Sequence, residues 1–266
     1  MIELLTNERT AVREAPVERA MLVPTTLGLA GVVVSAPSGP PAFGMLVAQG
    51  LDAHRSGVNG VWAKTARALA ANGVAAMRVD FPGMGDSAGV VGGRDAYRAV
   101  LAEVVTWFRA SEQLHRVGAI GACFGARQVL GLAAEGELDG PIALVTPALG
   151  RPSPAGAGAR MGHRVRRALG RPEPVDRAAA ADLGRTARRE RVLVLLGELD
   201  RQMVAAVASA RARLGTPDRV DVEMVPGERL HAFPTVTGQA AAIARLAAWA
   251  GSAGTSGPAH VVGAVA

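Results

Sequence analysis

The one cysteine of this 266-residue chain, Cys123, has the sequence surroundings of a nucleophile. It lies in Gly121-Ala122-Cys123-Phe124-Gly125, directly after the apolar run 117–122 and directly before an amphipathic pattern. A nucleophile on a sharp strand-to-helix turn needs small residues two positions away on each side, because the turn brings neighbouring backbone close. The amino end of the following helix would favour a thiolate and the negative charge of an acyl-transfer intermediate. This pattern predicts a cysteine that attacks a carbonyl carbon.

The turn resembles the nucleophile elbow of the α/β-hydrolase superfamily, which is usually G-x-S-x-G and has cysteine in branches such as the dienelactone hydrolases. The resemblance covers most of the chain and implies an acid after a late strand and a histidine after the last strand. Asp200, in Leu-Gly-Glu-Leu-Asp, and His231, in Leu-His-Ala-Phe, match those motifs. His231 would then be the base and Asp200 would orient its imidazole, with Glu198 as a nearby alternative acid. The segment 80–87 is similar to the family's D-x-x-G-x-G-x-S loop.

The same resemblance implies an oxyanion hole made of two backbone N–H groups. One is expected at Phe124, and the other in the loop after the apolar run 31–36. That loop reads Pro-Ser-Gly-Pro-Pro, and because proline has no N–H, the donor is Ser38 or Gly39, with Ser38 favoured. His54 and Arg55 are substrate-contact candidates by fold analogy alone.

A literal G-x-S-x-G also occurs around Ser87, but its context differs. Several loop residues separate it from the preceding apolar run, and no helix pattern follows, so Ser87 is interpreted as a structural loop residue. His115, His163 and His260 have no partner at catalytic or metal spacing and are interpreted as surface or loop residues.

Short apolar runs alternate with helical patterns along the chain, which predicts an α/β fold with a mostly parallel central sheet flanked by helices. Residues before Gly31 are expected to add one or two antiparallel strands. The hydrolase core is predicted over 1–147 and 191–250, with a helical cap or lid inserted at 148–190 and a flexible tail at 251–266. The predicted strands are 31–36, 74–81, 117–122, 141–146, 192–196 and 220–225, and the helical stripes fall within 62–70, 97–108, 126–133 and 243–250.

The amino-acid composition indicates which cofactors and partners to expect. One cysteine forms no internal disulfide, no Cys/His cluster has zinc spacing, and no phosphate-binding glycine motif is present, so neither a metal nor a cofactor is expected. The acidic amino terminus and the lack of a long apolar run predict a cytoplasmic protein without a membrane partner.

Residues 151–191 hold eleven arginines against four acidic residues, while the rest of the chain is about neutral. This segment is either a solvated face enriched in arginine by genome composition, or a positive rim for an anionic metabolite, a coenzyme A thioester or an acidic carrier protein. No nucleic-acid partner is expected, and the oligomeric state is left open.

The sequence predicts an enzyme that attacks an ester, lactone or thioester of a small metabolite. Two alternatives use the same site: an acyltransferase, or an enzyme of secondary metabolism, such as antibiotic biosynthesis, that eliminates an acyloxy group such as acetate with His231 as the base. A third alternative is a non-catalytic module that binds a small acidic ligand or a protein.

Overall fold

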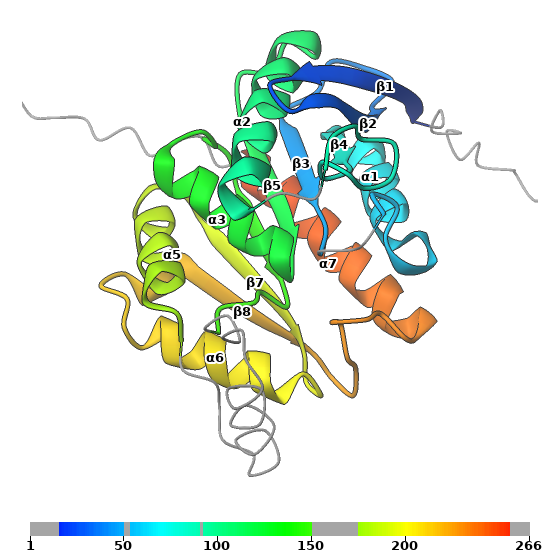
Figure 1. Ribbon diagram of the computed structural model, residues 1–266. Coiled ribbons are helices and arrows are strands. Elements are labelled where there is room, and N and C mark those ends of the chain that lie inside the picture. Colours follow the sequence, from blue (N-terminus) through cyan, green and yellow to red (C-terminus); the bar gives the residue numbers. More distant parts are fainter. Residues whose placement is uncertain (1–15, 51–53, 91–92, 151–174, 256–266) are drawn as a thin grey trace, which may run out of the picture.

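The computed structural model describes residues 16–50, 54–90, 93–150 and 175–255. In these residues the chain forms one eight-stranded sheet with helices on both faces (Figure 1). The strands are β1 (Val17–Thr25), β2 (Gly28–Ala36), β3 (Gly44–Ala48), β4 (Ala75–Val79), β5 (Val117–Ala122), β6 (Ile142–Val145), β7 (Val192–Gly197) and β8 (Val220–Val225).

The strand order across the sheet is β1-β2-β4-β3-β5-β6-β7-β8. Neighbours from β4 to β8 are parallel, whereas β2 runs antiparallel to both β1 and β4. The predicted α/β fold with a mostly parallel sheet is therefore confirmed. Parallel strands end at the same edge of a sheet, so the loops after β3, β5, β6 and β8 gather at one edge, where such folds bind their ligands.

Strand β3 was not predicted from the sequence. It lies between β4 and β5, so it is the neighbour of the strand that leads to Cys123. The run 31–36, whose following loop was expected to supply the second oxyanion N–H, belongs to β2 at the far side of β4. This difference changes which loop adjoins Cys123.

Helices cover the two faces of the sheet because alternate strand residues point to opposite sides. Leu46 and Ala48 belong to the core on the face of α2, α3, α5 and α6, whereas Met45 and Val47 belong to the core on the face of α1 and α7. Figure 1 shows these two layers around the central strands. The helices are α1 (Val61–Ala71), α2 (Arg94–Ser111), α3 (Phe124–Glu135), α5 (Arg177–Arg189), α6 (Arg201–Arg211) and α7 (Val236–Thr255), with short 3₁₀ turns η1 (Val58–Gly60) and η2 (Pro217–Arg219). None of these helices has the length and apolarity needed to span a membrane.

Helix α5 corrects part of the predicted cap. It falls within 148–190, yet it packs against α3, and Ala179, Leu183 and Ala187 are buried in the main core. This spacing of four residues places them on one helical face. The remainder of the predicted cap, 151–174, lies outside the described residues. Of the predicted tail, 251–255 belongs to α7, and 256–266 lies outside the described residues.

Candidate active site

Cys123 occupies the turn between β5 and α3 in a backbone conformation that residues other than glycine rarely adopt, with φ 47° and ψ −109°. The turn leaves no room beside it. A Cβ on Gly125 would lie 2.2 Å from the carbonyl oxygen of Ala48, and one on Gly121 would lie 2.6 Å from the Cα of Ala126. The reason for expecting glycine at both positions is therefore confirmed.

Two backbone hydrogen bonds hold this turn in place. The Cys123 N–H donates to the Val145 carbonyl oxygen at 3.1 Å, and the Ala148 N–H donates to the Cys123 carbonyl oxygen at 3.3 Å. Both partners belong to the neighbouring strand β6 or to its loop. The strained turn is thus fixed by the sheet, and it presents the thiol at the edge where the parallel strands end.

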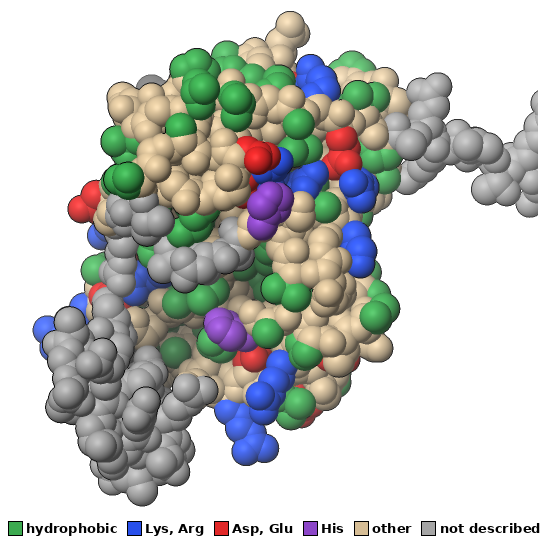
Figure 2. Space-filling model, turned by 45° about the vertical axis from the view of Figure 1, so that its right-hand side comes forward, with side chains coloured by type: hydrophobic (Ala, Val, Ile, Leu, Met, Phe, Trp, Pro, Cys, Tyr) green, Lys and Arg blue, Asp and Glu red, His purple; other side chains and the backbone are tan. Residues whose placement is uncertain are grey.

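A cavity of about 540 Å³ brings Cys123 together with His231 and His54. These side chains come from three loops, the first after β5, the second after β8 and the third between β3 and α1. Figure 2 shows a face of the molecule with histidine side chains and hydrophobic side chains between them. The other residues that line the cavity are Gly50, Gly57, Val58, Trp62, Ala122, Thr146, Leu230, Ala232 and Phe233.

Asp200 is buried beneath the loop that carries His231. Its Oδ2 accepts hydrogen bonds from the N–H of Leu230 at 2.8 Å and from the N–H of Gly197 at 3.2 Å. In the described part of the chain, no hydrogen bond joins Asp200 to the His231 ring or that ring to Cys123, although the resemblance implied an Asp-to-imidazole contact. The contacts of Asp200 are instead with the backbone of Gly197 and of Leu230, the residue before His231.

The alternative acid, Glu198, faces elsewhere. Its exposed carboxylate accepts the N–H of Gly227 at 2.7 Å. Gly197 explains why the two carboxylates differ, because a Cβ there would lie 2.4 Å from the Glu228 carbonyl oxygen and 2.8 Å from the Leu230 nitrogen. The close approach at Gly197 brings Asp200, and not Glu198, under the histidine loop.

Burial raises the pKa of the Cys123 thiol above its ordinary value, and the hydrogen bond with the Phe124 backbone opposes this rise only in part. The amino end of the following helix was expected to act in the opposite direction and to favour a thiolate. Burial instead favours the protonated thiol. A base must remove its proton before it can attack a carbonyl carbon.

Ser38 does not lie with Cys123. It lines a separate hollow with Pro16, Asn72 and Gly73, and because β2 is antiparallel to β4, the end of β2 lies at the opposite edge of the sheet. The loop that does adjoin Cys123 follows β3, because a Cβ on Gly50 would lie 3.6 Å from the Cys123 Cβ. The expected position of Ser38 beside Cys123 is therefore wrong. The signal for the loop after β3 was the apolar run 45–48 followed by Gln-Gly.

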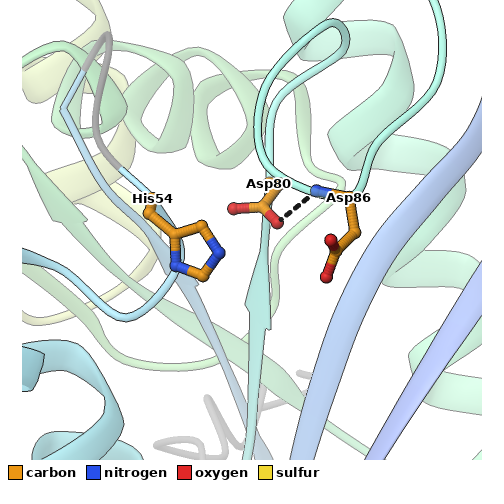
Figure 3. Close-up of side chains that lie close together, drawn as sticks. All are labelled: His54, Asp80 and Asp86. Carbon is orange, nitrogen blue, oxygen red and sulfur yellow. Dashed lines mark hydrogen bonds between the residues drawn. The ribbon is translucent and has the colours of Figure 1, made fainter.

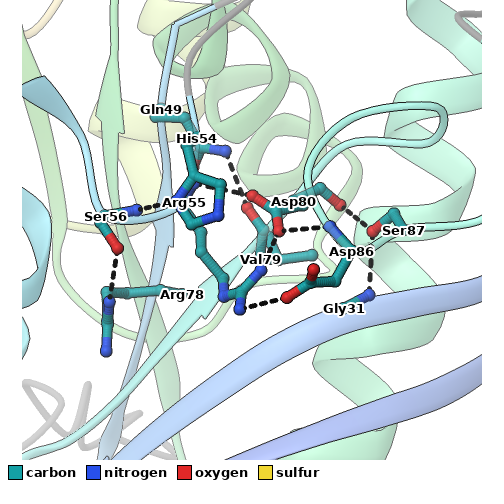
Figure 4. Close-up of polar contacts among 10 residues, drawn as sticks. All are labelled: Gly31, Gln49, His54, Arg55, Ser56, Arg78, Val79, Asp80, Asp86 and Ser87. Atoms are coloured by element: carbon teal, nitrogen blue, oxygen red, sulfur yellow. Dashed lines mark hydrogen bonds and ion pairs between the residues drawn. The ribbon is translucent and has the colours of Figure 1, made fainter.

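His54 and Arg55, both substrate-contact candidates, have different surroundings. Arg55 is largely buried, and its guanidinium pairs with Asp80 and Asp86 while its N–H donates to Asp80 Oδ1 at 2.7 Å (Figure 4). Its charge is satisfied inside the protein. His54 is exposed and lines the cavity, and its Nδ1 accepts the Ser56 N–H at 3.3 Å. A neutral His54 therefore carries its proton on Nε2.

The imidazole of His54 and the carboxylates of Asp80 and Asp86 face a common space (Figure 3), with one ligand atom of each within 4.8 Å of the others. This set resembles a metal site in residue type alone. Arg55 already bridges both carboxylates and supplies their positive counter-charge. The arrangement is an ion-pair network that fixes the loop carrying His54.

Ser87 is confirmed as a structural residue. Its hydroxyl donates to the Asp80 carbonyl oxygen at 2.7 Å and accepts the Gly31 N–H at 2.9 Å, which ties the 80–88 loop to β2. Ser87 is absent from the residues that line the cavity of Cys123. The other predicted surface histidine among the described residues, His115, is exposed, and His163 and His260 lie outside them.

Comparison with known proteins finds the fold in solved structures. A dienelactone hydrolase of Anabaena variabilis is 18% identical, with 88% of this chain and 97% of that chain covered and a TM-score of 0.66. Est1E of Butyrivibrio proteoclasticus, solved with ferulic acid bound, is 14% identical, with 86% and 97% covered and a TM-score of 0.68. An α/β serine hydrolase without a lid from Xanthomonas campestris is 19% identical, with 91% and 97% covered and a TM-score of 0.64. No family model and no curated protein matches the sequence.

These likenesses identify the architecture as the α/β-hydrolase fold. In this chain a cysteine stands at the elbow, where the Xanthomonas protein is described as a serine hydrolase.

Proposed function

We propose that the protein is an enzyme of the α/β-hydrolase class in which Cys123 attacks the carbonyl carbon of an ester, lactone or thioester. The observation that carries this proposal is the strained elbow, which holds Cys123 in the same cavity as His231. A buried thiol in an apolar core would need neither the positive φ nor the cavity. The serine hydrolase and dienelactone hydrolase neighbours support the same chemistry by analogy.

The first step is attack on the carbonyl carbon. The imidazole of His231 takes the proton of the Cys123 thiol, and the sulfur forms a bond to the carbonyl carbon while the carbonyl π electrons move to oxygen. The oxyanion receives the N–H of Phe124 and one N–H from the loop after β3. Because burial raises the pKa of Cys123, His231 is needed as the base that removes the thiol proton.

The second step releases the leaving group. The carbonyl re-forms, the bond to the leaving oxygen or sulfur breaks with its electron pair, and the imidazolium of His231 returns the proton to it. Water then attacks the acyl-cysteine with His231 again as the base, which frees the acid and the thiol. His54, with its proton on Nε2, is positioned to donate a hydrogen bond to a polar group of the substrate. Asp200 keeps the His231 loop in place.

The test is acylation followed by intact-mass spectrometry. The protein and its Cys123→Ala, His231→Ala and His115→Ala variants are each mixed with a panel of p-nitrophenyl esters and acyl thioesters. We expect an acyl adduct on the parent protein and on His115→Ala, no adduct on Cys123→Ala, and acylation slowed about a thousandfold or more in His231→Ala. His115 is exposed and remote from the cavity, so it is the matched control. Equal adducts on the parent protein and on Cys123→Ala would contradict the proposal.

One observation favours a second candidate, elimination of an acyloxy group such as acetate. This reaction needs a base and no nucleophile, and burial, which raises the pKa of the Cys123 thiol, favours its protonated form. His231 would remove a proton from the carbon next to the one that carries the acyloxy group, and the electron pair would form a double bond as the carboxylate leaves. Turnover retained in Cys123→Ala but lost in His231→Ala would favour elimination over attack.

We also propose that the partner is a coenzyme A thioester or an acidic carrier protein, which would bring its anionic part to the arginine-rich segment 151–191. In its described part, Arg185 pairs with Asp182 and Arg191 pairs with Asp221. Transfer of the acyl group to an acceptor other than water would appear as a new ester or amide when acceptors are added to the acylated protein.

A further inference from the structure

We propose that the substrate carries a ring-sized apolar group next to its scissile carbonyl, held by the side of the cavity formed by Val58, Trp62, Leu230 and Phe233. We call these four residues the apolar wall. The inference rests on the proposed function, because it names the substrate class of the Cys123 site. It is drawn from the shape and chemistry of the cavity.

The apolar wall is built around an aromatic pair. The rings of Trp62 and Phe233 meet edge to face, with centroids 5.4 Å apart and an interplanar angle of 89°. Trp62 comes from the first turn of α1, and Phe233 lies two residues after His231. The pair therefore packs α1 against the loop that carries His231. Both rings are almost entirely buried and still line the cavity. Aromatic edges and faces of this kind contact ring-shaped ligands favourably.

The backbone on both sides of the pair is held in unusual conformations. Phe233 has φ 45°, and its carbonyl oxygen accepts a hydrogen bond from Gln239 Nε2 at 3.1 Å. Gly57 has φ 71°, and a Cβ there would lie 2.4 Å from Trp62 Cδ1. Strained residues are kept where the surrounding structure fixes them, and they cluster at ligand sites. Here the positive φ of Phe233 and the missing side chain of Gly57 leave room for the two rings in the wall of the cavity that holds Cys123 and His231.

The cavity offers space and few polar contacts. Its volume of about 540 Å³ exceeds the roughly 150 Å³ in which benzene binds in an engineered protein core. Among the described residues that line it, the titratable side chains are Cys123, His54 and His231, with no carboxylate, lysine or arginine. Recognition therefore depends on apolar contact, with the polar groups reserved for the carbonyl and its immediate neighbours.

The experiment uses two matched ester series. In one, the p-nitrophenyl leaving group is constant and the acyl group is acetyl, butyryl, phenylacetyl or cinnamoyl. In the other, the acetyl group is constant and the leaving group is ethanol, benzyl alcohol or phenylethanol. We expect kcat/KM to rise about 10- to 100-fold from the small to the ring-bearing member in one of the series. The series that responds shows on which side of the carbonyl the ring lies.

Variants connect that preference to the wall. Val58 is 52% exposed at the cavity, so Val58→Asp introduces a charge there without opening the core, and we expect the preference for the ring to fall at least about tenfold. Phe233→Leu shortens the wall and should lower the same ratio. Val90→Asp is the matched control, because Val90 is 82% exposed and is not a cavity residue.

The outcomes separate this inference from the proposed function. A parent protein that acylates Cys123 and shows no preference for rings in either series, or a preference that Val58→Asp leaves intact, overturns the inference alone. Acylation that persists in Cys123→Ala overturns the proposed function. Loss of the ring preference in Val58→Asp, with the preference intact in Val90→Asp, supports the apolar wall.

Discussion

At the scale of single residues, Asp200 makes different contacts from those that its motif suggested. Its carboxylate holds two backbone N–H groups, one from its own turn and one from Leu230 directly before His231. These two hydrogen bonds connect the turn after β7 to the loop that carries His231. We therefore expect both the stability of the protein and the placement of His231 to depend on them.

We expect Asp200→Ala to lower the free energy of unfolding by about 2 to 4 kcal/mol, because two buried N–H groups lose their acceptor. Asp200→Asn can place its single amide oxygen where Oδ2 accepts both N–H groups, so it loses the charge but neither acceptor contact and should cost about 1 kcal/mol or less. Urea unfolding followed by circular dichroism measures both values. Glu198→Ala is the control, because the Glu198 carboxylate is exposed and accepts the N–H of Gly227, outside the contacts of Asp200. Equal stability of Asp200→Ala and the parent protein would contradict this account.

Cys123 and its flanking glycines were predictable from the sequence, because a tight turn imposes residue sizes at fixed offsets. The pKa of the thiol was not predictable in the same way. It depends on burial, which comes from residues distant in the sequence, and burial outweighs the local effect of the helix. The expected position of Ser38 was wrong for a similar reason. The place of a strand in a sheet depends on its pairing with other strands, which its own residues do not reveal.

At the scale of elements, β3 shows this limit most clearly. Five residues after a proline-rich loop give a weak strand signal, and their place between β4 and β5 depends on crossover connections. Helix α5 was included in the predicted cap because it is rich in arginine and follows 151–174. Its row of buried residues on one helical face was nevertheless present in the sequence. Helix α6 was also not predicted, since small alanines give its buried face little contrast.

The contact between α3 and the loop after β3 yields a second prediction. Gly125 lies where any side chain would meet the carbonyl oxygens of Ala48 and Gln49, at 2.2 and 2.4 Å from a Cβ. We expect Gly125→Ala to push this loop away from Cys123, with a loss of about 2 kcal/mol or more in stability and a larger proportional loss of acylation rate.

The measurement combines thermal unfolding with the acylation assay. Gly215→Ala is the matched control, because Gly215 is exposed and a Cβ there would meet nothing within 4 Å. Acylation by Gly125→Ala at the rate of the parent protein would show that the close approach of α3 and this loop is not needed for the reaction.

At the scale of the whole molecule, carboxylates with lowered pKa tie distant segments together. Burial alone would raise the pKa of Glu18, Asp139 and Asp176, but hydrogen bonds and charges from arginines outweigh it and lower each pKa. Glu18 on β1 pairs with Arg78 on β4, and Asp176 before α5 pairs with Arg127 on α3. These contacts bind the sheet edge and the helix layer to the core.

The sign of the pH effect follows from linkage. A carboxylate whose pKa is lower in the folded state adds stability above its unfolded pKa, about 4, and this stability is lost as the pH falls through the folded value. We expect the triple variant Glu18→Gln, Asp139→Asn, Asp176→Asn to lose less stability than the parent protein between pH 5 and pH 2.5. The difference should be about 1 kcal/mol per group or less, because the pairs are partly exposed.

Guanidinium unfolding midpoints at a series of pH values test this expectation. Asp218→Asn is the control, because Asp218 is exposed and forms no ion pair with another described residue. A triple variant with the same pH dependence as the parent protein would show that other groups govern acid stability.

The strain at Cys123 belongs to the backbone of the turn, and the atoms that impose it are main-chain atoms of β6, α3 and the loop after β3. None of these contacts depends on whether the side chain carries sulfur or oxygen. Cysteine and serine differ by that one atom, and a single nucleotide change converts one codon into the other. The backbone of the turn therefore fixes the position of this side-chain atom, and a point mutation could replace sulfur with oxygen there without changing the turn.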